Sequence, residues 1–170
     1  MWGGFAVAKR VDIPEEEYLK GLDKIVDQIQ AEVDKLKQHC TRGLANALVF
    51  VGAESQKRAP VEIGDLRGSL EISIDSAVIA KGVPSELSEE EKKRIRKEGG
   101  GNPKAGIGLV QVAQPPPKGT VGRISYNTPY ACNQHEHVEY DHPMGGQAKY
   151  LESVLTEEKD RIVRLIGGKD

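Results

Sequence analysis

The stretch that decides the fold is residues 58–74, RAPVEIGDLRGSLEISI, where a helix is predicted to end and a strand to begin. Pro60 ends the helix, because proline disfavours the helical conformation of the residue before it, and Gly64 provides a turn. From Leu66 onward apolar residues alternate with polar ones, and a period of two places one face of a strand on a core and the other in water. We therefore expect a strand from about Leu66 to about Ala80.

The polar face of this predicted strand carries Arg67, Ser69 and Glu71. A guanidinium is planar and can bind a carboxylate through two hydrogen bonds. Two interpretations of Arg67 remain open, an ion pair within the sheet and a contact with another subunit. We regard Arg67 and Glu71 as candidate interface residues.

The residues before this stretch predict an extended arm followed by a long helix. Glycines interrupt residues 1–13, and Pro14 is followed by glutamates, which is typical of a helix start because acidic side chains complement the helix dipole. Apolar residues then recur every three or four positions to about Arg58, which predicts an amphipathic helix. Gly43 leaves two alternatives open, one continuous helix or two helices that meet near it.

The residues after the first strand predict an insertion, two more strands and a final helix. Residues 82–106 are rich in charge and contain a capping-box pattern, which predicts a surface helix inserted between neighbouring strands. Residues 107–114 and 120–127 are predicted to pair as a hairpin with a proline-rich tip. Residues 151–166 carry the pattern of an amphipathic helix.

Together these elements predict an α+β fold, with a long N-terminal helix and a C-terminal helix packed on a small, mainly antiparallel sheet. The sequence contains neither an internal repeat nor the pattern of a second core. We therefore expect one domain over residues 14–170, preceded by an extended arm at 1–13 and interrupted by the insertion at about 82–106.

The composition argues against several classes of protein. The chain has 170 residues and a formal charge of −2, so attraction of the whole molecule to nucleic acid or to an anionic membrane is not indicated. Two cysteines, Cys40 and Cys132, are too few for a disulfide framework. The apolar N-terminal residues lack the leading positive charge of a signal peptide, and no stretch approaches the length of a membrane span.

A cluster of potential metal ligands lies at residues 132–142, with the sequence CNQHEHVEYDH. If this segment is extended, His135, His137 and Glu139 project to one side, and imidazole and carboxylate groups can bind zinc or a harder divalent ion. The spacing matches none of the usual zinc patterns. Two interpretations stay open, a polar edge at a subunit contact and a metal site of His135, His137 and His142.

Motifs for catalysis are lacking in the sequence. The Gly-X-Ser-X-Gly pattern of a nucleophilic serine is absent, and Cys132 has no context that would activate its thiol. The glycine-rich stretches do not connect a strand to a helix as a phosphate-binding loop does. We therefore expect neither enzymatic activity nor a cofactor.

Two blocks of the sequence resemble one known family. The first, RAPVEIGDLRGSL, resembles the Ala-Pro…Gly-x-Leu-Arg-x-Ser signature of the small tail-completion and head–tail joining proteins of tailed bacteriophages, although Glu62-Ile63 replaces the usual threonine. The second, residues 125–155, resembles that family's later block, in which a Tyr-Ala pair precedes a glutamate on a strand, a loop with proline and glycine, and a C-terminal helix. The matching residues here are Tyr130, Ala131, Glu136, Pro143, Gly145, Gly146, Lys149, Tyr150 and Leu151.

The resemblance implies a structural virion protein, a head–tail joining or tail-completion subunit of the neck or tail terminator. Such a subunit forms a homo-oligomeric ring, sixfold or twelvefold, between the portal or adaptor and the tail. Its partners would be copies of itself and other neck and tail proteins, with DNA passing nearby without sequence-specific binding and with no membrane. It would be located in the virion, and in the host cytoplasm during assembly.

The alternative function is a metal-binding, zinc-dependent hydrolytic protein that uses His135, His137 and His142. If the protein is a structural virion subunit, the candidate residues for subunit contacts lie in the arm, the first strand, the hairpin tip and the second block. They are Trp2, Phe5, Arg67, Glu71, Pro116, Lys118 and Glu136.

Overall fold

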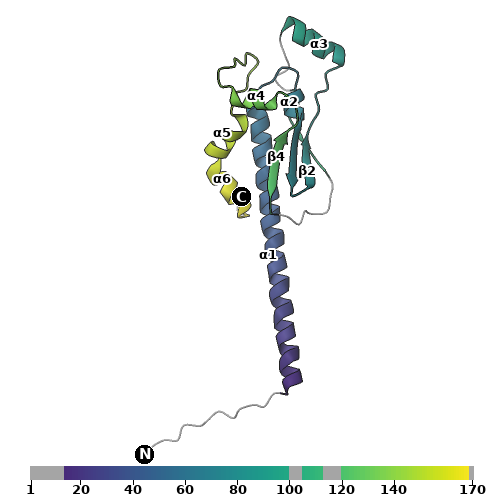
Figure 1. The fold of residues 1–170 in the computed structure, drawn as a ribbon, viewed down its shortest axis with the longest axis vertical. Helices are drawn as coiled ribbons and strands as arrows, with labels where there is room; N and C mark the ends of the chain where they lie inside the picture. Colours follow the sequence, from purple (N-terminus) through teal and green to yellow (C-terminus); the bar gives the residue numbers. More distant parts are fainter. Residues whose placement is uncertain (1–13, 100–104, 113–119, 169–170) are drawn as a thin grey trace, which may run out of the picture. The chain divides into compact units, whose positions relative to one another are not determined.

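The computed structural model describes residues 14–99, 105–112 and 120–168. Internal contacts divide the chain into two units, Met1–Leu36 and Lys37–Asp170, and each is described by itself. Helix α1 spans Glu15–Arg58 and belongs to both (Figure 1). The other helices are α2 Asp65–Gly68, α3 Glu89–Glu98, α4 Ala131–Glu136, α5 Tyr150–Glu157 and α6 Lys159–Ile166, and the strands are β1 Leu70–Ile74, β2 Ala77–Gly82, β3 Leu109–Gln111 and β4 Gly122–Tyr126.

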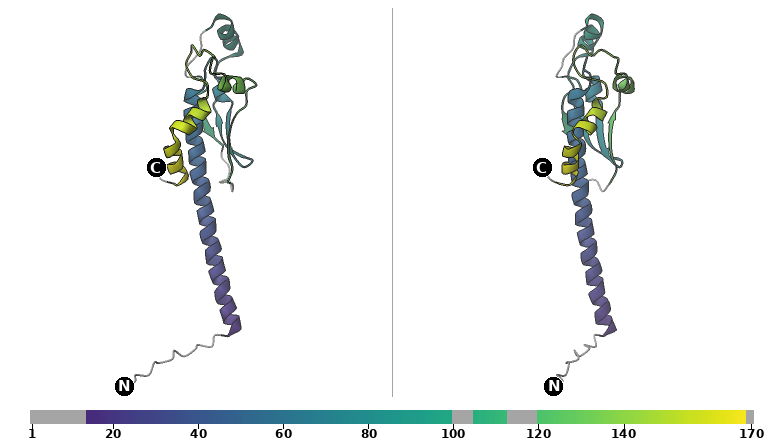
Figure 2. Two further views of the ribbon diagram at one scale, coloured as in Figure 1. Left: turned by 60° about the vertical axis from the view of Figure 1, so that its left-hand side comes forward. Right: turned by 90° about the vertical axis from the view of Figure 1, so that its left-hand side faces the viewer.

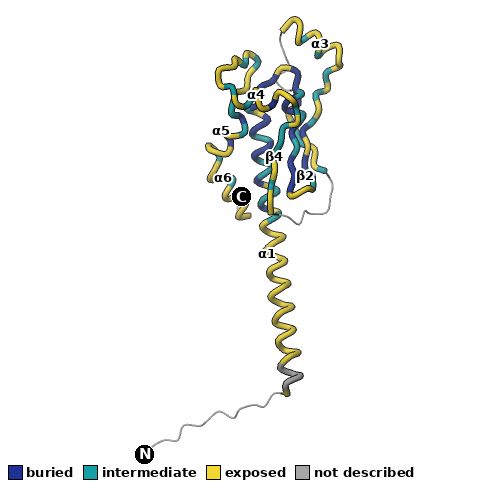
Figure 3. Tube along the Cα trace, in the orientation of Figure 1, coloured by how far each residue is buried: buried dark blue, intermediate teal, exposed yellow. Residues whose placement is uncertain are grey.

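The first unit contains the N-terminal part of α1. Every side chain from Leu19 to Leu36 is exposed, and Figure 3 shows this stretch in the colour of exposed residues. The apolar residues recur along it every three or four positions, as the sequence predicts. Because α1 is continuous through Gly43, the alternative of two separate helices is wrong.

The second unit is built on an antiparallel sheet with the strand order β3-β2-β1-β4. Leu70 and Ile72 of the central strand β1 are buried, as is Ala80 of β2, and Leu48 and Val49 of α1 pack against this cluster. The predicted α+β class, with long N-terminal and C-terminal helical segments on an antiparallel sheet, is therefore confirmed.

Within this unit, α1 lies between the sheet and the helices α5 and α6 (Figures 1 and 2). Glycine makes the close approach on one side possible, because a Cβ atom at Gly43 would lie 2.2 Å from the main-chain oxygen of Ile166 at the end of α6. Arg58 adds a polar contact, since its Nη1 atom lies 2.6 Å from Glu157 and 3.1 Å from Ser153. The C-terminal half of α1 is thus covered on two faces.

The predicted strand over residues 66–80 is wrong in two places. Residues 65–68 form α2, in which the N–H group of Gly68 donates to the carbonyl of Gly64 at 2.9 Å. Leu66 and Leu70 are four positions apart, a spacing that suits a helical turn as well as a strand. The remainder is a hairpin of β1 and β2, turned at Asp75, which has a positive φ of 51°.

The predicted hairpin of residues 107–114 and 120–127 is also wrong. Both segments contain a strand, β3 and β4, but β3 pairs with β2 and β4 pairs with β1. The two strands therefore lie at opposite edges of the sheet. Alternation of apolar and polar residues indicates a strand but does not specify its partner.

Two helical segments differ from the sequence predictions. The C-terminal helix is broken at Glu158 into α5 and α6, and the break changes the direction of the chain so that α6 ends beside Gly43 of α1 (Figure 2). The segment that contains the histidines begins with the short helix α4, a helix that was not predicted from the sequence. None of the described helices is both long and apolar enough to span a membrane.

The insertion between β2 and β3 contains the predicted surface helix, α3. Ser88 caps it, and both hydrogen bonds of the capping box with Glu91 are present. Lys92 and Arg96 lie 3.1 and 3.7 Å from the carboxylate of Asp65, which links α3 to α2.

Substitution of two glycines of α1 tests this packing. Gly43→Ala should destabilise the second unit by about 1–3 kcal/mol, because the added methyl group displaces the backbone of α6. Gly21→Ala is the matched control, because nothing lies within 4 Å of its added Cβ atom. The higher helix propensity of alanine should therefore stabilise the helix by about 0.5–1 kcal/mol. Urea unfolding and helical circular dichroism measure both, and equal effects would contradict the described packing.

Candidate interaction site

The side chain of Arg67 holds the end of α1 rather than extending from the sheet. Only 3% of the residue is exposed. Its Nε and Nη2 atoms donate to the carbonyl of Ala59 at 3.0 and 2.7 Å, and Nη2 also donates to Lys57 at 3.4 Å. Burial lowers the pKa of the guanidinium, although the nearby Tyr126 opposes this. Arg67 therefore orders the motif loop, by which we mean residues 59–64.

Gln56 of α1 lies next to this arginine and is fully buried. Its Nε2 atom donates to the carbonyls of Arg67 at 2.8 Å, Gly108 at 3.1 Å and Gly106 at 3.3 Å. Its carbonyl oxygen accepts the N–H group of Gly108 at 3.2 Å. One amide side chain thus joins α1, α2 and the segment that leads to β3.

A pair of tyrosines forms a second buried contact below the motif loop. Tyr126 shares a 2.7 Å hydrogen bond with Ser55, and its ring packs edge-on against Tyr150 at 5.0 Å. Tyr150 donates to the carbonyl of Ala131 at 3.2 Å. Burial raises the pKa of Tyr126 to about 12 and also raises the pKa of Tyr150. These contacts join α1 and β4 to the second sequence block.

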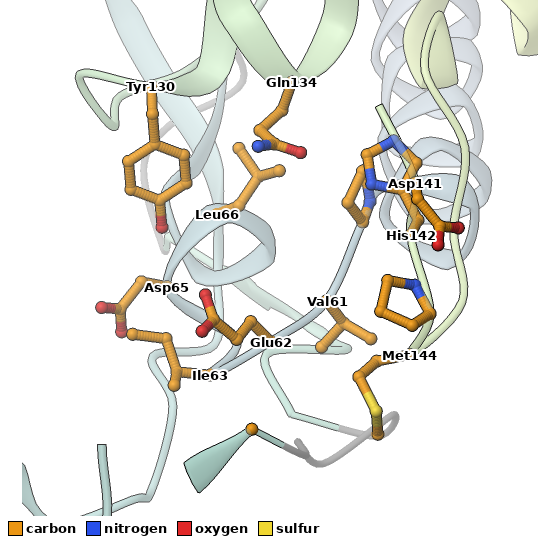
Figure 4. Close-up of a pocket in the computed structure, with 14 residues that line it drawn as sticks. Val61, Glu62, Ile63, Asp65, Leu66, Tyr130, Gln134, Asp141, His142 and Met144 are labelled. Carbon is orange, nitrogen blue, oxygen red and sulfur yellow. The ribbon is translucent and has the colours of Figure 1, made fainter. Parts of the chain in front are cut away.

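A pocket of about 490 Å³ lies where the two sequence blocks meet (Figure 4). Figure 4 shows Asp65 and Tyr130 on one side, His142 and Met144 on the other, and Leu66 between them. The motif loop and α2, residues Tyr130 and Gln134 at α4, and residues 141–144 all contribute to its lining. The lining residues are Pro60, Val61, Glu62, Ile63, Gly64, Asp65, Leu66, Gly99, Tyr130, Gln134, Asp141, His142, Pro143 and Met144.

The pocket combines apolar walls with negative charge. Carboxylates of Glu62, Asp65 and Asp141 line it. Burial raises the pKa of the Tyr130 phenol, and the charges of Asp65 and Glu62 raise it further. The Nε2 atom of His142 is buried without a hydrogen-bond partner among the described residues. The site therefore suits a ligand segment that carries apolar and basic side chains.

The histidines occupy different parts of the second block. His135 lies on α4, where its Nδ1 atom is 2.7 Å from Glu136, and His137 follows α4 with its Nδ1 atom 2.6 Å from Glu139. The described residues contain no group of three or more His, Cys, Asp or Glu side chains placed to hold a metal ion. The condition of an extended segment, under which His135, His137 and Glu139 would share one side, is not met, because His135 lies on α4 whereas His137 and Glu139 follow it.

The other predicted interface residues fall in several places. Glu71 of β1 lies 3.3 Å from Lys81 on the neighbouring strand. Glu136 forms an ion pair with Lys149 and a hydrogen bond with His135, which together lower the pKa of its carboxyl group. The remaining four lie outside the described residues, namely Trp2, Phe5, Pro116 and Lys118.

The patterns in the sequence did not identify Ser55 or Gln56 as contact residues, although both are fully buried. The burial of Ser55 could have been predicted from the sequence. The apolar stripe of α1 passes through Ala47 and Val51, and Ser55 is the next position on the same face. A polar residue at a core-facing position needs a hydrogen-bond partner. Which partner it takes depends on loops that are distant in the sequence.

Replacement of Gln56 tests the central contact. Gln56→Leu keeps a similar volume but leaves the carbonyls of Arg67, Gly106 and Gly108 without their donor, so unfolding free energy should fall by about 3 kcal/mol or more. Gln38→Leu, an exposed position of the same helix, should change it by less than about 0.5 kcal/mol. Urea denaturation compares the two, and similar small losses would argue against the network.

Alkaline pH tests the burial of Tyr126. Below about pH 10, the pKa of an unfolded tyrosine, the phenol is neutral in both states and its contribution to stability is fully present. Between about pH 10 and the folded-state pKa of about 12, the unfolded chain releases the proton first, so stability falls by about 3 kcal/mol.

Tyr126→Phe should remove the part of the alkaline loss that Tyr126 contributes and leave the part from Tyr150, whose pKa is also raised. It should cost about 1 kcal/mol near neutral pH through the lost bond to Ser55. Tyr140→Phe removes a hydroxyl group from an exposed residue and should retain the loss seen in the unmodified protein. Urea unfolding over this pH range provides the measurement, and an unchanged alkaline profile in Tyr126→Phe would contradict the assignment.

No protein-family model, no curated protein and no solved structure matches this chain.

Proposed function

We propose that the protein is a structural subunit of a tailed-bacteriophage virion that acts in head–tail joining or tail completion. The observation that carries the proposal is the meeting of the two family-like blocks. Residues 60–66 of the first block are far apart in the sequence from Tyr130, Gln134 and residues 141–144 of the second, yet all of them line one pocket (Figure 4). The most distinctive parts of the sequence are thus used to build a single surface.

The chemistry of this surface supports binding of a polypeptide rather than catalysis. Its floor includes Val61, Ile63 and Leu66, and Asp65 is already engaged by Lys92 and Arg96 of α3. An apolar groove with a few polar groups suits an extended segment whose side chains fill it. A ring subunit needs such a surface, because head-to-tail assembly joins one patch to a different patch on the neighbour.

The segment we assign to the pocket is the N-terminal arm of a neighbouring copy. Its sequence, MWGGFAVAKR, combines the aromatic residues Trp2 and Phe5 with the basic pair Lys9-Arg10. This composition complements the apolar wall and the carboxylates Glu62 and Asp141. Repetition of the contact around a closed ring gives the sixfold or twelvefold assembly that the sequence resemblance implies.

Deletion of residues 1–10 tests the proposal. The full chain should form rings visible by negative-stain electron microscopy, with a molar mass of six or twelve copies. The deletion should abolish the rings and leave urea unfolding of the second unit unchanged, because Gln56 and Arg67 bond to main-chain carbonyls of the second unit itself. Rings that persist without the arm would contradict the assignment of the occupant.

A charge placed in the pocket gives an independent test. Met144→Glu adds a negative charge to a site that already contains three carboxylates, so ring formation should be lost. Val138→Glu is the matched control, because Val138 is 71% exposed and does not line the pocket. Light scattering of both variants measures the assembly. If both variants lose the rings, or if both keep them, the pocket is not the contact between subunits of the ring.

A further inference from the structure

The N-terminal part of α1 carries an apolar stripe that has no partner among the described residues. Leu19, Ile25, Val26, Ile29 and Leu36 are each more than half exposed. Leu22 and Val33, at 41% and 37%, complete the same face. A continuous row of large aliphatic side chains in water marks an interaction surface.

The spacing of this stripe is that of a coiled coil. Six of its residues alternate in steps of three and four, the a and d positions of a seven-residue repeat. Leu19, Val26 and Val33 occupy the a positions, and Leu22, Ile29 and Leu36 occupy the d positions. Ile25, at a g position, widens the stripe at one point.

The other faces of this helix carry polar side chains that bond along the helix. Lys35 lies 2.6 Å from Glu32, and Gln30 donates to Asp34 at 3.1 Å. Gly21 lies on the polar side, with nothing within 4 Å of the place of its Cβ atom. The helix therefore presents one narrow apolar face and otherwise polar surface, which is typical of a coiled-coil strand.

We propose that two copies of the chain pair through residues 19–36 as a parallel, in-register coiled coil. β-branched residues at a positions with leucine at d positions favour two parallel strands. Four of the six positions follow this pattern, Val26 and Val33 at a with Leu22 and Leu36 at d, whereas Leu19 at a and Ile29 at d do not. In that register Glu32 occupies a g position and Lys37 the following e position. Glu32 of one copy therefore faces Lys37 of the other, and their opposite charges attract. The surface is complementary to itself, so a second copy is the occupant.

This pairing goes beyond the proposed function and does not depend on it. The arm and the pocket join subunits into a ring, whereas residues 19–36 join subunits two at a time. Six and twelve are both even numbers, so every subunit of such a ring could have one partner in a pair. Deletion of residues 1–10 separates them, because it removes the predicted ring contact and leaves the stripe intact.

Cysteine cross-linking of the full chain tests the register. In a Cys40→Ser, Cys132→Ser background, Val26→Cys should form covalent pairs under mild oxidation, because equivalent a positions of a parallel pair lie within disulfide distance. Lys24→Cys, on the outer face, should form at least about tenfold fewer. The result should be the same after deletion of residues 1–10. Equal yields at both positions would overturn the proposal. The absence of a cross-link at Val26→Cys would also overturn it, and would indicate an antiparallel pair or a monomer.

A substitution on the stripe tests the affinity. Ile29→Glu places a charge in the pair interface and should weaken pairing about 100-fold. Gln28→Glu introduces the same side chain at the adjacent outer position and should leave pairing within about threefold. Both positions are exposed, so both variants should keep the fold of the second unit. Sedimentation equilibrium of the chain without residues 1–10 measures the dissociation constants, and equal constants for the two variants would overturn the proposal.

Discussion

The buried amide of Gln56 is the contact on which the arrangement of the second unit depends. Three main-chain carbonyls, from Arg67, Gly106 and Gly108, converge on its nitrogen in the interior. Burial of a carbonyl without a donor costs about 1–3 kcal/mol, so these loops are stable in this position only while the amide is present. Arg67 acts in the same way on the carbonyl of Ala59. The motif loop is thus held by the side chain of Arg67 together with main-chain bonds such as that from Val61 to Gly145.

The sequence predicts the elements of this fold better than their connections. The three-to-four residue spacing of α1 and the capping box at Ser88 are local patterns, and both predictions are confirmed. The pairing of β4 with β1, and not with β3, is set by contacts between residues that are distant in the chain, which a local pattern does not encode. The segment around His135 begins with a helix, and the ring of His135 packs edge-on against Tyr150, a contact between distant residues that a local pattern does not encode.

The same distinction applies to the candidate site. The motif loop and the second block could be identified from the sequence, because their residue types and order are unusual. Their meeting at one pocket could not, since it involves main-chain bonds between distant residues, from Val61 to Gly145 and from Gln147 to Arg58, together with the packing of Tyr126 against Tyr150. Arg67 was recognised as important, but its role is internal, because its guanidinium is turned toward the end of α1. An arginine in a sequence does not reveal whether it points outward or inward.

We propose that this chain works by joining copies of itself, through an acidic, apolar pocket and through the stripe of α1. Native mass spectrometry of the purified full chain over a range of concentrations tests this most directly. We expect a closed assembly of six or twelve copies that dissociates through dimers as the concentration falls. A monomer at every concentration, or an assembly with an odd number of copies, would contradict it.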